Sequence, residues 1–244
     1  MRRIFKSIMS LVLTCSLVFA SSSIAFALEF ETDNLQFDFQ DVLILEIDGV
    51  RTATISDETT EYTTVFNTVD NTIQVFAKNL LTNVVSAGVL VSTDIDTKIT
   101  LQTVIHQDTF SNFEYDIYTG NPNEWNLERP SGAFSQYYFM VYENSSNEAE
   151  LDKFYNAVNT LNDREWDAVA AYSLALVTTA ASGFISGMAV ASGGILTPAV
   201  IASIVAATGA TGNAAVALAR IGTSCNDCLR AYMEVYHATD NMHF

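Results

Sequence analysis

Cys225 and Cys228, in the run Cys225-Asn226-Asp227-Cys228, have a type and spacing that point to defined chemistry. A C-x-x-C pair can be a redox motif, half of a zinc site or a local disulfide. Zinc would need two further ligands, and His237 and His243 do not stand at a familiar finger spacing. A redox pair normally follows a strand, whereas this pair follows an Ala-rich segment. The pattern favours a structural disulfide that closes a very short loop, with free thiols as the alternative.

Catalytic chemistry has little support in the rest of the residue pattern. The chain lacks H-E-x-x-H, G-x-S-x-G and G-x-x-x-x-G-K-[ST] motifs, and its histidines are His106, His237 and His243. A histidine near a chain end, such as His237, is more often exposed than paired with a cysteine. Asp94 and Asp96 would share one face of a strand and could serve acid–base or calcium chemistry, yet such pairs arise by chance among 28 acidic residues. We therefore predict no catalytic, cofactor-binding or metal-binding residue and no enzymatic activity.

The first 27 residues have the pattern of a removable signal peptide. Basic residues precede an apolar stretch from Ile8 to Phe19, and Ala25-Phe26-Ala27 fits the small-x-small pattern of signal peptidase. A membrane anchor is the alternative, but the apolar run is short for a bilayer of roughly 30 Å. The pattern predicts a mature chain that begins at Leu28 and acts as a secreted, extracellular protein. An oxidising destination also favours the disulfide.

The mature chain is strongly acidic. The whole chain has 28 acidic and 11 basic residues, and loss of three basic residues with the signal peptide leaves a formal charge of −20. Such a chain should not bind nucleic acid, and anionic lipid should repel it at neutral pH. With 49% hydrophobic residues, it is long enough for one large domain or two smaller ones, each with its own core.

Residues 28–144 are predicted to form an acidic, β-rich domain. Val42–Ile47 and Arg51–Ile55 are candidate strands joined by the turn pair Asp48-Gly49. Alternating apolar residues mark further strands near residues 73–77, 99–105, 113–117 and 136–142. We expect an antiparallel sheet or sandwich with a solvated acidic face.

The pattern becomes helical in residues 145–244, so the expected fold class is α+β. Ser145-Ser146-Asn147-Glu148 has the form of a capping box, and apolar residues then recur at helical spacing over 147–162. A final amphipathic helix is predicted over 227–244.

Between these two helices lies the most informative feature of the sequence. From Ala168 to Asn226, only Arg220 is charged. Glycines and a proline divide this stretch into two predicted helices, Trp166–Ala191 and Pro198–Ile221, which would form an apolar antiparallel hairpin over 166–221. Either helix would exceed the ~20 residues needed to cross a bilayer.

The predicted hairpin has two interpretations, since an apolar helix is buried either in protein or in a membrane. Gly183-Phe184-Ile185-Ser186-Gly187 has a spacing that lets helix backbones approach closely, whereas Thr208 to Asn213 could break the second helix. Many Ala, Ser, Thr and Gly residues make spontaneous membrane insertion marginal. The candidate residues for membrane insertion are Trp166, Gly183, Phe184, Ile185, Gly187, Ile195, Leu196, Ile201 and Ile204.

Three runs carry a resemblance to a known family: the basic residues Arg2, Arg3 and Lys6, the strand–turn run Asp48–Ile55, and the run from Gly193 through Cys228. The chain resembles the large secreted bacteriocins of Gram-positive bacteria of the geobacillin type, which combine a signal peptide, a β-rich part and a Gly/Ala-rich helical part. The resemblance implies a secreted antibacterial protein that acts on bacterial membranes.

The sequence does not identify the membrane or surface receptor of such a toxin, and it leaves self-association possible. Many small membrane-active bacteriocins are cationic and are attracted to anionic lipid. This chain is acidic, so that attraction cannot bring it to its target. The alternative is a secreted, non-catalytic structural or binding protein whose apolar helices are only its core.

Overall fold

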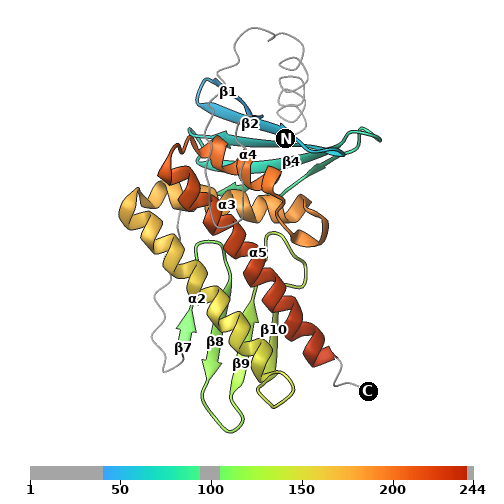
Figure 1. The fold of residues 1–244 in the computed structure, drawn as a ribbon, viewed down its shortest axis with the longest axis vertical. Helices are drawn as coiled ribbons and strands as arrows, with labels where there is room; N and C mark the ends of the chain where they lie inside the picture. Colours follow the sequence, from blue (N-terminus) through green and yellow to red (C-terminus); the bar gives the residue numbers. More distant parts are fainter. Residues whose placement is uncertain (1–40, 94–104, 241–244) are drawn as a thin grey trace.

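The fold is α+β, with antiparallel sheets followed by helices, as predicted. The structure is a computed structural model that describes residues 41–93 and 105–240 (Figure 1). The predicted signal peptide, 1–27, and the mature start at Leu28 lie outside these residues.

The first sheet, sheet A, begins with the predicted hairpin. Asp48 and Gly49 have φ angles of 50° and 77°, and two consecutive positive angles give a tight turn whose twist suits the flanking strands. The sheet is antiparallel in the order β1-β2-β3-β4-β5, and β6 also pairs with β4. Its strands are β1 (Leu43–Ile47), β2 (Val50–Ser56), β3 (Thr60–Asn67), β4 (Thr72–Asn79), β5 (Val85–Ala87) and β6 (Val91–Ser92).

The second sheet, sheet B, is antiparallel in the order β10-β9-β8-β7. Its strands are β7 (Ile105–Gln107), β8 (Glu114–Tyr118), β9 (Glu124–Glu128) and β10 (Tyr138–Tyr142). Alternate residues of β8 and β9 are buried, and α2 contacts β8. The two sheets occupy opposite ends of the molecule with helices between them, so the expected sandwich is not the arrangement that forms (Figure 1).

Helix α2 (Glu148–Ala171) begins where the sequence predicts but ends later. The predicted capping box does not form: Asn147 occupies the N-cap position without capping the helix, and its side-chain amide donates to the Tyr142 carbonyl at 3.0 Å. The predicted end near residue 162 is wrong because Leu161, Glu165 and Ala168 continue one buried stripe. Trp166 therefore belongs to α2.

The predicted uncharged hairpin consists of shorter pieces. Helix α3 (Leu174–Val190) begins after Ser173, whose Oγ accepts a hydrogen bond from Leu176 N–H at 3.1 Å. A short 3₁₀ helix, η1 (Ser192–Gly194), leads to α4 (Pro198–Thr208), which Thr197 caps as the sequence suggests. Long helices over 166–191 and 198–221 are thus not present. Among the described residues, no helix is long and apolar enough to cross a membrane.

Helix α5 (Asn213–Asp240) joins two segments that the sequence analysis separates. The predicted break near 208–213 is confirmed, but the helix then runs without interruption through the cysteine pair. Helix α5 packs along α2, and α3 and α4 lie between these two helices and sheet A (Figure 1). Buried side chains from Val42 to Val235 form one hydrophobic cluster, so the β-rich and helical parts share a core.

Candidate functional site

Helices α3 and α4 form an uncharged helical pair at the centre of the molecule. No charged residue occurs from Leu174 to Thr208. Every residue from Val177 to Met188 is buried, and so is every residue from Val200 to Ala207. Helix α3 contacts β4, α4 contacts β2 and β3, and α5 contacts both helices. The central stretches of both helices are therefore covered by the rest of the fold, whereas their first residues, such as Leu174 and Pro198, are exposed.

The small residues of α3 permit close contact with α4. A Cβ atom on Gly183 would lie 2.6 Å from Cγ2 of Ile204, and one on Gly187 would lie 2.9 Å from Cγ1 of Val200. Both distances are shorter than a normal van der Waals contact, so only glycine fits without a shift of the neighbours. The Gly-x-x-x-Gly run thus allows the close helix approach that the sequence predicts.

The predicted membrane-insertion residues differ in their burial. Trp166 lies apart on α2 with 53% of its surface exposed, and its ring is 5.2 Å from that of Phe110. Ile195 is partly buried against the core. The others, all buried in or beside the helical pair, are Gly183, Phe184, Ile185, Gly187, Leu196, Ile201 and Ile204.

Four hydrogen bonds, three of which involve buried serines, connect the pair to sheet A. Val75 N–H donates to Ser186 Oγ at 2.8 Å, so β4 is linked to α3. The hydroxyls of Thr64 and Ser203 share a hydrogen bond of 2.9 Å between β3 and α4. In addition, Ser182 Oγ donates to the Ser92 carbonyl of β6 at 3.3 Å, and Arg51 Nη1 of β2 donates to the Ala207 carbonyl of α4 at 3.4 Å. Apolar packing and these four hydrogen bonds therefore hold the pair in place.

The predicted disulfide is not present in the structure. Cys225 and Cys228 are free, and both are buried in the middle of α5. The prediction assumed that residues 225–228 form a loop, but α5 runs through them without a break. Burial raises the pKa of both thiols well above the ordinary value, and the nearby Glu165 carboxylate adds to the rise. Neither thiol is therefore activated as a nucleophile.

Glu165 is a buried carboxylate that sequence analysis missed. It accepts hydrogen bonds from Phe110 N–H at 2.7 Å, Ser111 N–H at 3.1 Å and Ser111 Oγ at 2.6 Å. Burial raises its pKa to about 7, because the loss of water outweighs these three hydrogen bonds. The sequence pattern that could have identified Glu165 is its position on the apolar stripe of α2, where an acidic residue is unexpected.

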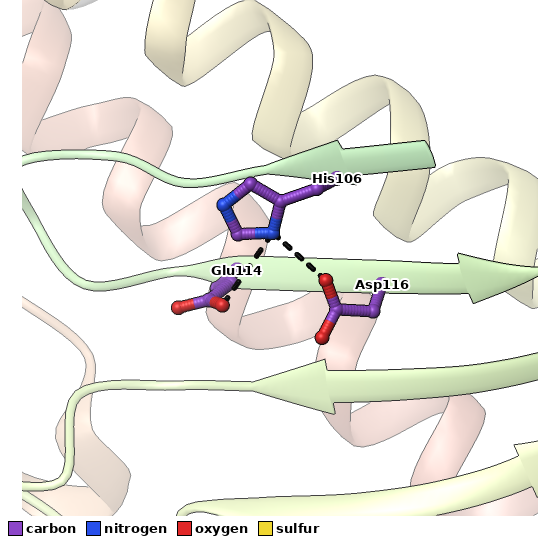
Figure 2. Close-up of side chains that lie close together, drawn as sticks. All are labelled: His106, Glu114 and Asp116. Atoms are coloured by element: carbon purple, nitrogen blue, oxygen red, sulfur yellow. Dashed lines mark hydrogen bonds and ion pairs between the residues drawn. The ribbon is translucent and has the colours of Figure 1, made fainter. Parts of the chain in front are cut away.

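His106, Glu114 and Asp116 form a cluster on the face of sheet B opposite the core (Figure 2). His106 Nδ1 lies 2.8 Å from Asp116 Oδ1 and 3.6 Å from Glu114 Oε1. One potential ligand atom from each residue lies within 4.8 Å of the others, so the three could hold a metal ion. The sequence signal was Glu114-x-Asp116, which places two carboxylates on one strand face. Asp94 and Asp96, the acidic pair noted in the sequence, lie outside the described residues.

Comparison with models of protein families, with curated proteins and with solved structures gives no match. The fold and its sites therefore have to be interpreted from their own geometry. They define an α+β protein with a buried uncharged helical pair and a polar cluster on an open sheet face.

Proposed function

We propose that this is a secreted antibacterial protein of the bacteriocin type, which acts on the membranes of target cells through the α3–α4 pair. The observation that carries the proposal is that an uncharged segment, Leu174–Thr208, is enclosed within a strongly acidic chain. The sheets and the α2–α5 pair would keep this segment in solution until it reaches a target.

The packing of the pair is compatible with its release. Its contacts with sheet A combine apolar side chains with four hydrogen bonds. Each such bond contributes only about 1 kcal/mol net. Gly183 and Gly187 both fit closely against side chains of α4, so the two helices could leave the core as one packed unit once the further contact of Gly183 with Ile73 of β4 is broken.

A reversible crosslink tests whether the pair must leave sheet A. Thr64→Cys combined with Ser203→Cys places two thiols where the hydroxyls are 2.9 Å apart, close enough for a disulfide between β3 and α4. We expect the wild-type mature protein to release dye from lipid vesicles and to inhibit related bacteria. The oxidised double variant should do neither, and reductant should restore dye release.

The two single-cysteine variants and reductant-treated wild type are the controls, because none of them contains the crosslink. Full activity of the oxidised double variant would exclude release of α4 from sheet A. Wild-type protein that neither releases dye nor inhibits any strain of a broad panel would overturn the antibacterial proposal. N-terminal sequencing of secreted protein should first confirm a start at Leu28.

A second candidate function is a non-catalytic binding protein whose apolar helices are only its core. The observation that favours it is the open face of sheet B, where alternate residues of β10, Tyr138, Met140 and Tyr142, are exposed. Acidic residues of β8 and β9 share this face, which suits a positively charged partner. Growth inhibition that survives the crosslink but is lost in Tyr138→Ser/Tyr142→Ser would favour this candidate.

A further inference from the structure

The strand register of sheet B brings one imidazole and two carboxylates to the same point. His106 on β7 stands directly opposite Asp116 on β8, and Glu114 lies two residues earlier on the same strand. All three side chains project from the face that does not pack on α2, and they converge in Figure 2. Their convergence is a property of the sheet and does not depend on a loop.

The surroundings of the cluster favour a bound cation. Glu114 stands directly opposite Glu128 on β9, and like charges in that position destabilise a sheet. Asp116 lies two residues along the same strand, so three carboxylates share this part of the sheet face. A divalent ion at this point would relieve the repulsion among these carboxylates.

Asn126 is a polar neighbour of the cluster on strand β9. Asn126 stands directly opposite Asp116, and its Nδ2 lies 3.5 Å from Asp116 Oδ2. Its Oδ1 atom is buried and has no hydrogen-bond donor in the structure. Because the amide turns its Nδ2 toward Asp116, Asn126 can orient that carboxylate as an outer-shell partner of the cluster.

We propose that His106, Glu114 and Asp116 bind a divalent transition-metal ion of the Zn²⁺ class. An imidazole combined with carboxylates suits such ions, whereas Ca²⁺ and Mg²⁺ prefer oxygen ligands alone. With metal–ligand bonds of ~2.1 Å, tetrahedral ligand atoms lie roughly 3.4 Å apart. The distances of 2.8 and 3.6 Å from His106 Nδ1 bracket that value, so small side-chain rotations complete the site.

The ion would fasten an edge strand of the sheet. Strand β7 has three residues and, among the described strands, pairs with β8 alone, and two of the metal ligands would come from β8. Positions not taken by protein would hold water, because the cluster is partly open to solvent. The proposal does not depend on the antibacterial function, since the α3–α4 pair packs on the other sheet.

Titration of metal-free mature protein with ZnCl₂, followed by calorimetry and thermal unfolding, tests the site. We expect one Zn²⁺ per chain, a higher melting temperature with Zn²⁺, and weaker binding on acidification because protons compete for the ligands. His106→Gln and Asp116→Asn should each weaken binding by more than the ~10–100-fold typical for loss of an outer-shell partner. Asn126→Ala should fall within that range. Glu124→Gln, on the same sheet face but outside the cluster, is the matched control and should bind normally.

Co²⁺ distinguishes this site from the two thiols. Co²⁺ bound through nitrogen and oxygen absorbs weakly, whereas a cobalt–thiolate bond absorbs intensely. We therefore expect a weak Co²⁺ spectrum without thiolate absorption. Thiolate absorption, equal Zn²⁺ affinity in His106→Gln and wild type, or a Ca²⁺ affinity equal to that for Zn²⁺ would each overturn the proposal. So would the absence of Zn²⁺ binding to folded wild-type protein.

Discussion

At the scale of single residues, Glu165 links three parts of the chain. Its carboxylate on α2 receives hydrogen bonds from the backbone of residues 110 and 111, and the Cys225 and Cys228 thiols of α5 lie nearby. Burial, with a smaller contribution from the negative charge of Asp108, raises its pKa to about 7. The charge state of one buried group is therefore coupled to the packing of α2 against its neighbours.

Glu165 should make the protein more stable at acidic pH. Its folded-state pKa of about 7 exceeds the ordinary 4.5, so its favourable contribution is complete below pH 4.5 and is lost as pH rises through 7. The loss is on the order of 3 kcal/mol at most. Denaturant unfolding from pH 4 to 8 should show this decline in wild type and a flatter profile in Glu165→Gln. Asp163→Asn, at an exposed α2 position, should keep the wild-type slope, and equal slopes in all three proteins would contradict the assignment.

The buried thiols lead to a second residue-scale prediction. Because Cys225 and Cys228 are free and inaccessible, native protein should resist alkylation, and unfolded protein should take up two alkyl groups without reductant. Intact mass spectrometry counts the groups. Alkylation of unfolded protein that requires reductant would instead show that the pair is oxidised after secretion.

At the scale of secondary structure elements, the contact between α3 and α4 depends on glycine. A Cβ atom at Gly187 would approach Leu196 and Val200 at 2.9 Å and Ile204 at 3.1 Å. These branched side chains belong to the core, so they have little freedom to move aside. The packing distance of the two helices is therefore set by the absence of a side chain.

Gly187→Asp should be strongly destabilising. The aspartate side chain would overlap with its neighbours and would also bury an unpaired charge. Steric overlap and an unpaired buried charge each cost on the order of a few kcal/mol. We expect loss of at least about 3 kcal/mol of unfolding free energy in denaturant titration. Gly212→Asn is the control, since its added side chain meets open space and asparagine tolerates the local φ of 59°. A Gly187→Asp protein of wild-type stability would show that α3 and α4 are not packed as described.

At the scale of the whole molecule, one core joins the β-rich and helical parts. Sheet A packs on α3 and α4, sheet B packs on α2, and the helices pack on one another. The buried cluster is continuous through all these elements. Separation at residue 144 would leave two apolar surfaces without cover.

The mature protein should therefore unfold in a single cooperative transition. Far-UV circular dichroism and tryptophan fluorescence, which report on helices and on Trp125 and Trp166, should give the same midpoint in denaturant. A fragment of residues 28–144 should not fold alone, because the buried face of sheet A would lose α3 and α4. Two separate transitions, or a stably folded fragment, would show that the two parts are independent domains.

Local patterns in the sequence were sufficient to predict the fold class and several ends of helices and strands. The Asp48-Gly49 turn, the Thr197 cap and the Gly-x-x-x-Gly contact depend on residues that are close in sequence. Strands β3 and β9 were missed for local reasons as well. The buried Thr64 interrupts the apolar alternation of β3, and β9 has only five residues with charged ends.

Contacts between distant segments decided the rest. Packing against α5 continues α2 past residue 162, and this extension carries Glu165 to the backbone of residues 110 and 111. Continuity of α5 removes the loop that a local disulfide was expected to close. The approach of His106 to Asp116 depends on the register of β7 and β8. Helical periodicity specifies which face of a segment is apolar, but only the tertiary structure determines what that face meets, because partner positions depend on the global arrangement of the chain.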